Sequence, residues 1–197
     1  RKYSPTSSVF SICIILMGIF FYNCENTITD IPVDINYGVV INEINYRSSN
    51  LFNPEDWIEL HNPTNEAITI DTWEFKDNND NVFTFPQSVV LLPGDYLVLC
   101  ENAATFFQIF PNISNVVGDF EFGLSGDGDL VSLFDSNGLL IDKVEYGVTT
   151  PWPTEPDGEG PTLELINPSL DNASAVNWAP SNDNNGTPGG INSVFNE

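Results

Sequence analysis

The sequence predicts an all-β protein, an antiparallel β-sandwich with at most one short helix. Charged residues make up only 17% of the 197 residues, while aromatic residues reach 12% and apolar residues 41%. This composition supplies a hydrophobic core and excludes a wholly disordered chain. The 14 glycines and 14 prolines interrupt every long helical pattern, which argues against a helical bundle.

Short runs rich in Val, Ile, Phe, Tyr and Trp, separated by turn residues, predict the strands. The expected strands are residues 38–46, 57–61, 67–71, 73–76, 82–85, 89–92, 96–100, 129–135 and 139–146. Residues 103–109 are the one segment that reads as a helix. The Asn-Gly pair at 137–138 supplies the positive φ angles of a tight turn and predicts a hairpin. Closely spaced strands without long helices between them are typical of a sandwich.

Residues 1–23 are expected to form a signal peptide. Arg1 and Lys2 precede an uncharged apolar run at 9–22, which is shorter than the roughly 20 residues that span a bilayer. Cys24 follows this run and resembles the lipobox cysteine of bacterial lipoproteins, so we expect it to carry a lipid that anchors the chain to a membrane. The residues before it are larger than usual for a lipobox, which leaves simple secretion and an uncleaved anchor as alternatives. The expected location is the cell envelope or the medium.

The exported part divides into a short acidic tether at 24–36 and one domain at 37–193. The stretch from about 149 onward is rich in Pro, Gly and Asn, but it also holds Trp152 and Trp178. Because a free linker needs no such side chains, we expect this stretch to lie against the sandwich.

The charge balance restricts the partners of the protein. Asp and Glu number 28 against five Lys and Arg, which gives a net charge of −23. So acidic a chain repels phosphate backbones, and we expect no nucleic-acid binding.

Several sequence pieces together resemble the bacterial lamin tail domain family. The pieces are VVINEI at 39–44, DWIELHNP at 56–63, IDTWEF at 70–75, LPGDYLVL at 92–99, GDLVSL at 128–133, residues 138–146 and GTPGGINS at 186–193. The resemblance implies an immunoglobulin-like β-sandwich. It also implies a secreted or surface-located protein, since such bacterial domains occur there, often beside hydrolases or other modules.

On this basis we expect a non-enzymatic exported or surface-anchored module that binds a surface protein or polysaccharide or supports neighbouring domains. The alternative is a small exported hydrolase or carbohydrate-binding protein that uses surface carboxylates and aromatic side chains. Carboxylates that converge in a concave pocket with an exposed aromatic would favour the alternative. Acids dispersed over turns would favour the binding module.

Six residues of these pieces are expected to have structural roles. They are Glu43, Trp57, Glu59, Asn62, Trp73 and Gly94. Glu59 is flanked by apolar residues, and a buried carboxylate needs hydrogen bonds, which we expect from backbone N–H groups of the turn near Asn62. Trp57 and Trp73 are expected to fill the core or its edge, with a sugar-binding platform as the alternative.

The sequence offers little support for catalysis, and we expect no catalytic residue. His61 is the one histidine, so neither a histidine zinc cluster nor a Ser-His-Asp arrangement is indicated. Glu43 and Glu59 would be the candidates for a glycosidase-like pair, but such pairs arise by chance in an acidic chain. Cys100 closes an apolar run and reads as a small buried hydrophobe.

Calcium is the one cofactor for which the sequence offers candidate ligands. Asp77 and Asp80 in one loop and Asp127 and Asp129 in another offer closely spaced oxygen ligands. The alternative is that Asn, Asp and Gly simply form the turns, and we favour it.

Overall fold

The computed structural model describes residues 38–197. The expected signal peptide, the lipid attachment site at Cys24 and the acidic tether therefore lie outside the described residues. Among residues 38–197, no helix has the length and apolarity needed to cross a bilayer.

The described residues form twelve strands, one α-helix and one 3-10 turn. The strands are β1 (Val40–Asn45), β2 (Trp57–His61), β3 (Ile68–Thr69), β4 (Glu74–Lys76), β5 (Val82–Thr84), β6 (Val90–Leu91), β7 (Tyr96–Cys100), β8 (Val116–Val117), β9 (Asp129–Phe134), β10 (Leu140–Tyr146), β11 (Leu163–Leu165) and β12 (Trp178–Pro180). The helix is α1 (Ala103–Ile109), and the 3-10 turn is η1 (Ala175–Asn177).

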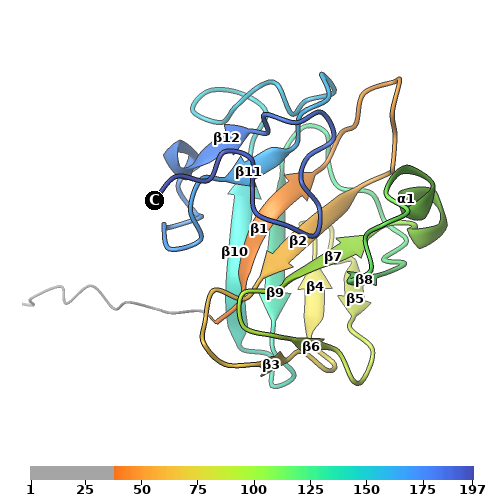
Figure 1. Cartoon of the computed structure of the whole chain (residues 1–197), viewed down its shortest axis with the longest axis vertical. Coiled ribbons are helices and arrows are strands. Elements are labelled where there is room, and N and C mark those ends of the chain that lie inside the picture. The colour runs from red at the N-terminus through yellow and green to blue at the C-terminus, as the bar shows by residue number, and fades with distance from the viewer. Residues whose placement is uncertain (1–37) are drawn as a thin grey trace, which may run out of the picture. The chain divides into compact units, whose positions relative to one another are not determined.

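Two main sheets build the sandwich, which confirms the predicted fold class. The larger sheet has the strand order β12-β11-β1-β2-β7-β8, and the smaller has the order β10-β9-β4-β5 (Figure 1). Strands β3 and β6 form a separate pair at one end. All pairings are antiparallel except that of β7 with β8, which is parallel because α1 and its flanking loops carry the chain back across the molecule between them.

The space between the sheets is filled by one apolar cluster. Its members from the larger sheet include Ile44, Ile58 and Leu163, which are cross-strand partners on the inner face of β1, β2 and β11. Phe75 of β4 and Trp73 just before it contribute from the opposite layer, with Trp73 only 8% exposed. The expectation that Trp73 lies in the core is therefore confirmed.

The outer face of the larger sheet is also covered. Trp57, Glu59 and His61 alternate with inward-facing Ile58 and Leu60, as the period of a strand requires, yet all five are buried. Helix α1 covers one end of this face, where Phe106 and Phe110 pack edge-on against the Trp57 ring at 6.1 and 6.3 Å between centroids.

Helix α1 occupies the residues that the sequence predicts. Asn102 caps it, since its side-chain oxygen accepts a hydrogen bond from the Thr105 N–H. The predicted hairpin is also confirmed, because β9 pairs with β10 across the Asn137-Gly138 turn and Gly138 has a φ of +79°.

The stretch after residue 149 joins the sandwich, and it contributes more than a covering segment. β11 pairs with β1, and β12 pairs with β11, so this stretch supplies two strands of the larger sheet. Strands β8, β11 and β12 were not predicted, because each is only two or three residues long and too short for its sequence to show the period of a strand. Between the two sheets, Asp142 Oδ2 of β10 accepts hydrogen bonds from the Ile41 N–H and from Asn172 Nδ2.

Candidate functional site

Three glutamates lie side by side on the outer face of the larger sheet. Glu43 of β1 is the direct cross-strand partner of Glu59 on β2 and of Glu164 on β11. Each of the three side chains has no exposed surface. We call Glu43, Glu59 and Glu164 the glutamate trio.

A glycine-rich segment near the C-terminus covers the glutamate trio. We call residues 186–194 the C-terminal strap. Its backbone N–H groups donate to all three carboxylates: Thr187 to Glu43 Oε1 at 3.0 Å, Gly189 to Glu59 Oε2 at 2.5 Å and Val194 to Glu164 Oε2 at 3.1 Å.

Side-chain donors complete the hydrogen bonding of the trio. Thr162 Oγ1 donates to Glu43 Oε1 at 2.5 Å, Asn42 Nδ2 donates to Glu59 Oε1 at 2.9 Å, and Ser193 Oγ donates to Glu164 Oε2 at 2.8 Å. The ion pairs within residues 38–197 are Arg47–Asp157 and Lys76–Glu74, so neutral donors alone stabilise the three carboxyl groups.

Glycine is required where the strap approaches the carboxylates. Gly186 has a φ of +79°, and a Cβ atom there would overlap Glu43 Oε1 and lie 2.6 Å from Thr162 Oγ1. Gly186 therefore allows the strap to approach closely enough for the Thr187 N–H to donate to Glu43.

Burial and the charges of neighbouring carboxylates alter the acidity of Glu43 and Glu59. Burial raises the pKa of Glu43 well above its usual range, and the neighbouring charges of Glu59 and Glu164 raise it further. Burial also raises the pKa of Glu59 to about 8, against the opposing hydrogen bonds from Asn42 and Gly189.

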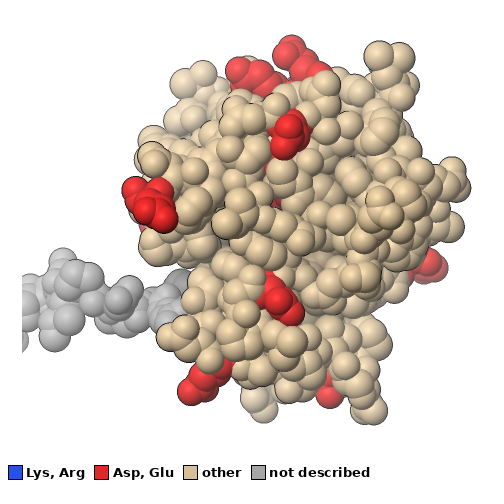
Figure 2. Space-filling model, in the orientation of Figure 1, with Lys and Arg blue, Asp and Glu red and all other residues tan. Residues whose placement is uncertain are grey.

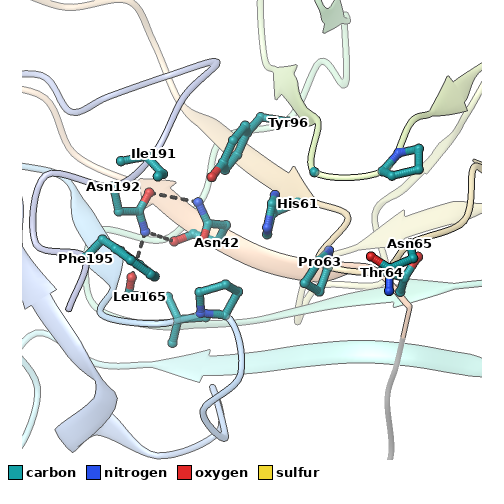
Figure 3. Close-up of a pocket in the computed structure, with 13 residues that line it drawn as sticks. Asn42, His61, Pro63, Thr64, Asn65, Tyr96, Leu165, Ile191, Asn192 and Phe195 are labelled. Atoms are coloured by element: carbon teal, nitrogen blue, oxygen red, sulfur yellow. Dashed lines mark hydrogen bonds between the residues drawn. The ribbon is translucent and has the colours of Figure 1, made fainter. Parts of the chain in front are cut away.

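A pocket of about 460 Å³ opens beside the strap (Figure 3). Ile191, Asn192 and Phe195 lie on one side of it, and Thr64 and Asn65 lie on the other. The complete lining is Asn42, His61, Pro63, Thr64, Asn65, Pro93, Gly94, Tyr96, Leu165, Pro168, Ile191, Asn192 and Phe195.

Two stacked rings form the middle of the pocket wall. His61 and Tyr96, cross-strand partners on β2 and β7, have ring centroids 4.3 Å apart with planes inclined by 19°. His61 Nδ1 lies 3.1 Å from the Asp95 carbonyl oxygen and donates to it. Because burial lowers the pKa of His61, the ring is neutral at pH 7, and Nε2 is left as a hydrogen-bond acceptor.

Paired amides fix the floor of the pocket. Asn42 Nδ2 donates to Asn192 Oδ1 at 2.8 Å, and Asn192 Nδ2 donates to the carbonyl oxygens of Asn42 and Leu165 at 2.9 and 2.8 Å (Figure 3). Asn192 therefore attaches the strap to β1 and β11 at the point where the strap becomes a pocket wall.

A family model described as Lamin Tail Domain matches residues 36–148, more than half of the chain. The chain belongs to the lamin tail domain family. The match includes Glu43, Glu59 and the His61–Tyr96 pair, and it ends before Glu164 and the strap. In this lamin tail domain, the site is thus built partly from family sequence and partly from the C-terminal stretch that follows the matched region.

One solved structure with partial similarity is a crystal structure of a DUF4876 family protein from Bacteroides thetaiotaomicron. The similarity covers 58% of this chain and 55% of that chain, with 12% sequence identity and a TM-score of 0.43. The lamin tail domain chain thus spans about half the length of that protein. A comparison with curated proteins found no match.

The expected structural residues of this lamin tail domain take up definite roles. Asn62 Nδ2 donates to the carbonyl oxygens of Glu66, Leu91 and Leu92, and the Gly94 N–H donates to the Asn62 carbonyl oxygen. Asn62 and Gly94 thereby join the loops at the end of β2. The donors to Glu59 come from Asn42 and the strap instead of the turn near Asn62, so that part of the expectation is wrong. Glu59 receives these donors because its side chain lies on the outer face of the sheet, which the strap covers.

Trp57 is fully buried beneath α1 and Trp73 is buried between the sheets, so the alternative of a sugar-binding platform at these residues is wrong. Cys100 is buried beside Trp57, as expected for a small hydrophobe, and burial raises the pKa of its thiol to about 12. All three residues support the fold of the lamin tail domain.

The structure brings the two acidic loops of the calcium prediction together. The Asn78 N–H donates to Asp129 Oδ1 at 3.1 Å, which joins the loop of Asp77 to the loop of Asp129. Both of these carboxylates are buried and accept further backbone N–H groups, whereas Asp80 and Asp127 are exposed. Within residues 38–197, no group of three or more His, Cys, Asp or Glu residues has a metal-binding arrangement.

Sequence reasoning missed Glu164, Thr187 and Asn192. The signal for Glu164 is present, because Leu163-Glu164-Leu165 repeats the apolar–Glu–apolar order of Ile58-Glu59-Leu60. Thr187 and Asn192 carry no comparable local signal, since their roles depend on how the strap folds back over the sheet.

Proposed function

We propose that this protein is a non-enzymatic surface module that binds a short segment of a neutral polysaccharide in the pocket beside the C-terminal strap. The observation that carries this proposal is the combination of stacked rings, amides and apolar walls around one concave space. Ligand pockets typically pair apolar and aromatic walls with a few fixed polar groups.

The chemistry of the lining favours an uncharged, hydroxyl-rich ligand. Within the described part of the chain, the residues that line the pocket include neither a carboxylate nor a cationic side chain. His61 Nε2 is available to accept a ligand hydroxyl, and the amide of Asn65 and the phenol of Tyr96 offer further polar groups. The net charge of −23 disfavours anionic polysaccharides.

Binding is proposed in place of hydrolysis because of where the carboxylates lie. A glycosidase needs two carboxyl groups that flank the ligand, whereas the glutamate trio is fully buried under the strap. On the face shown in Figure 2, acidic side chains are spread over the surface. This distribution supports the binding module over the exported hydrolase.

The proposed location is the cell surface, with the chain anchored by a lipid on Cys24. An envelope polysaccharide is then within reach of the pocket. A surface protein as partner is the competing outcome, and the binding experiment distinguishes the two.

The test is a binding screen of the full chain against neutral oligosaccharides, followed by calorimetry. Tyr96→Ala should weaken binding at least tenfold, because it removes a pocket wall and the stacking partner of His61. Phe107→Ala is the matched control, since Phe107 is an aromatic on α1, 41% exposed and outside the pocket lining. If no neutral oligosaccharide binds at millimolar concentration, or if both variants bind alike, the proposal is wrong.

A further inference from the structure

One hydroxyl group of the strap lies between two carboxyl groups of the trio. Thr187 Oγ1 is 3.4 Å from Glu43 Oε2 and 3.0 Å from Glu164 Oε1. A threonine hydroxyl has a single proton, so it donates to one of these oxygens, and a hydrogen bond with the other requires a proton on that carboxyl group. The arrangement is therefore satisfied when one of the two carboxyl groups is protonated.

The other partners of each glutamate identify the protonated group. Both oxygens of Glu164 already accept hydrogen bonds, with Ser193 Oγ and the Val194 N–H donating to Oε2 and Thr187 Oγ1 in position to donate to Oε1. Glu43 Oε1 accepts from Thr162 Oγ1 and the Thr187 N–H, which leaves Oε2 free to carry a proton.

We propose that Glu43 holds a proton on Oε2 and donates it in a hydrogen bond to Thr187 Oγ1, that Thr187 in turn donates to Glu164 Oε1, and that this chain of hydrogen bonds makes docking of the C-terminal strap dependent on pH. The strap stays docked while the proton is present. When Glu43 ionises, three adjacent buried carboxylates repel one another and Thr187 loses a donor, so the strap detaches.

The groups around the trio leave it without a compensating cation. On the larger sheet, the titratable neighbours are Tyr96 and His61, which lie further along the same face on β7 and β2. Burial and the charge of Glu59 raise the pKa of Tyr96. The strap itself has no titratable side chain, and Asp183 and Glu197 are the acidic residues that flank it. Burial also favours the protonated form of Glu43.

Detachment of the strap would open the pocket. Ile191 and Asn192 belong to the strap, and Phe195 follows it directly, so these three wall residues move with it. Ligand affinity should therefore fall at alkaline pH. This consequence rests on the proposed polysaccharide binding, whereas the docking of the strap does not.

Hydrogen exchange of the full chain, corrected for the intrinsic pH dependence of exchange, tests the docking without any ligand. Between pH 6 and pH 10, the protection factors of the strap should fall at least tenfold, while those of β9 stay within twofold. Protection of the strap that is constant over this range would overturn the proposal.

Two chemically identical substitutions on adjacent strands sharpen the test. In Glu43→Gln, the amide carbonyl accepts from Thr162 and Thr187 and the NH₂ group donates to Thr187 Oγ1, so the strap should stay protected at every pH. In Glu164→Gln, the amide carbonyl accepts from Ser193 and Val194 and the NH₂ group donates to Thr187 Oγ1, which then donates to Glu43 Oε2. The strap should therefore stay protected without a proton on Glu43. A pH-dependent fall in Glu43→Gln equal to that of the wild type would contradict the proposal.

Carbon-13 NMR of the glutamate carboxyl groups provides a readout that needs no variant. In the wild type at pH 7, the Glu43 carboxyl should show the shift of a protonated acid, and an ionised Glu43 overturns the proposal. Comparing oligosaccharide affinity at pH 6 and pH 9 then separates the two ideas. If strap protection falls with pH but no oligosaccharide binds, the strap mechanism is supported and the proposed function is rejected. If an oligosaccharide binds but strap protection does not change with pH, the proposed function is supported and the strap mechanism is rejected.

Discussion

Glu43 and Glu59 lie directly opposite each other on β1 and β2, and both carboxyl groups are fully buried. Like charges at opposed positions of an antiparallel pair destabilise a sheet. Here, N–H groups of the C-terminal strap and raised pKa values allow the pair to persist. The relationship explains why the sheet needs the C-terminal strap and why stability should depend on pH.

Stability should decline as the pH rises from 5 to 9. The folded-state pKa values of Glu43 and Glu59 are raised, to about 8 for Glu59, so the folded protein binds more protons than the unfolded chain. Their contribution is fully present below an unfolded pKa of about 4.5 and is lost as the pH rises through the folded values. Asp56, with a pKa raised to about 7 mainly by burial, adds to the loss near neutrality. The measurement is Tm against pH.

Asp56→Asn should flatten the part of this pH profile around pH 7. Asp127→Asn is the control, because Asp127 is exposed and its substitution should leave the profile unchanged. A Tm that rises from pH 5 to pH 9 in the wild type would contradict the assignment.

Replacing Gly186 should cost far more stability than replacing Gly138. Both glycines have a φ of +79°, so alanine at either position bears the cost of left-handed backbone, roughly 1–2 kcal/mol. At Gly138 a Cβ meets no atom within 4 Å, whereas at Gly186 it overlaps Glu43 Oε1. Urea denaturation should show the larger loss for Gly186→Ala, and equal losses would mean that the strap does not contact the trio.

Trp57→Ala and Trp73→Ala should each reduce the free energy of unfolding by roughly 3–5 kcal/mol. Trp57 loses its contacts with Phe106 and Phe110, and Trp73 leaves a cavity between the sheets. For a marginally stable domain this is a large share of the total. Phe107→Ala, at an exposed site, should change stability by less than about 0.5 kcal/mol, and a similarly small effect of either Trp substitution would place that side chain at the surface.

Monovalent salt should raise the Tm, because 28 acidic residues against five basic ones repel one another. Salt at about 0.15 M shortens the Debye length to roughly 8 Å and screens this repulsion. We expect calcium at millimolar concentration to stabilise no more than magnesium at equal ionic strength. A saturable stabilisation by calcium alone that is abolished by Asp127→Asn or Asp80→Asn would instead reveal a specific site.

Cys24 should become the lipid-bearing N-terminus after removal of residues 1–23. This expectation rests on the apolar run at 9–22, which ends two residues before Cys24. Mass spectrometry of the protein from a lipoprotein-processing host measures the modification. An unmodified Cys24 in a cleaved chain would support simple secretion, and an intact N-terminal segment would support an uncleaved anchor.

The fold class and most of the strands could be predicted from local patterns in the sequence. Strands β2 and β7 and helix α1 were predicted to the residue, because their period, capping and flanking turns are local properties. The family was also readable, since the order of its pieces is preserved along the chain. Glu59 was singled out because apolar neighbours make a carboxylate conspicuous, and Glu43 because it lies in a piece that resembles the family.

The roles of these residues, in contrast, depend on contacts between distant parts of the chain. The glutamate trio exists because β11, far along the chain, pairs with β1 and places Glu164 beside Glu43. The pocket exists because residues 191–195 return to His61 and Tyr96. Such contacts depend on loop closure over more than a hundred residues, and no local pattern encodes them. The period of a strand fixes which face a side chain occupies, whereas the segment that covers that face is determined by the fold as a whole.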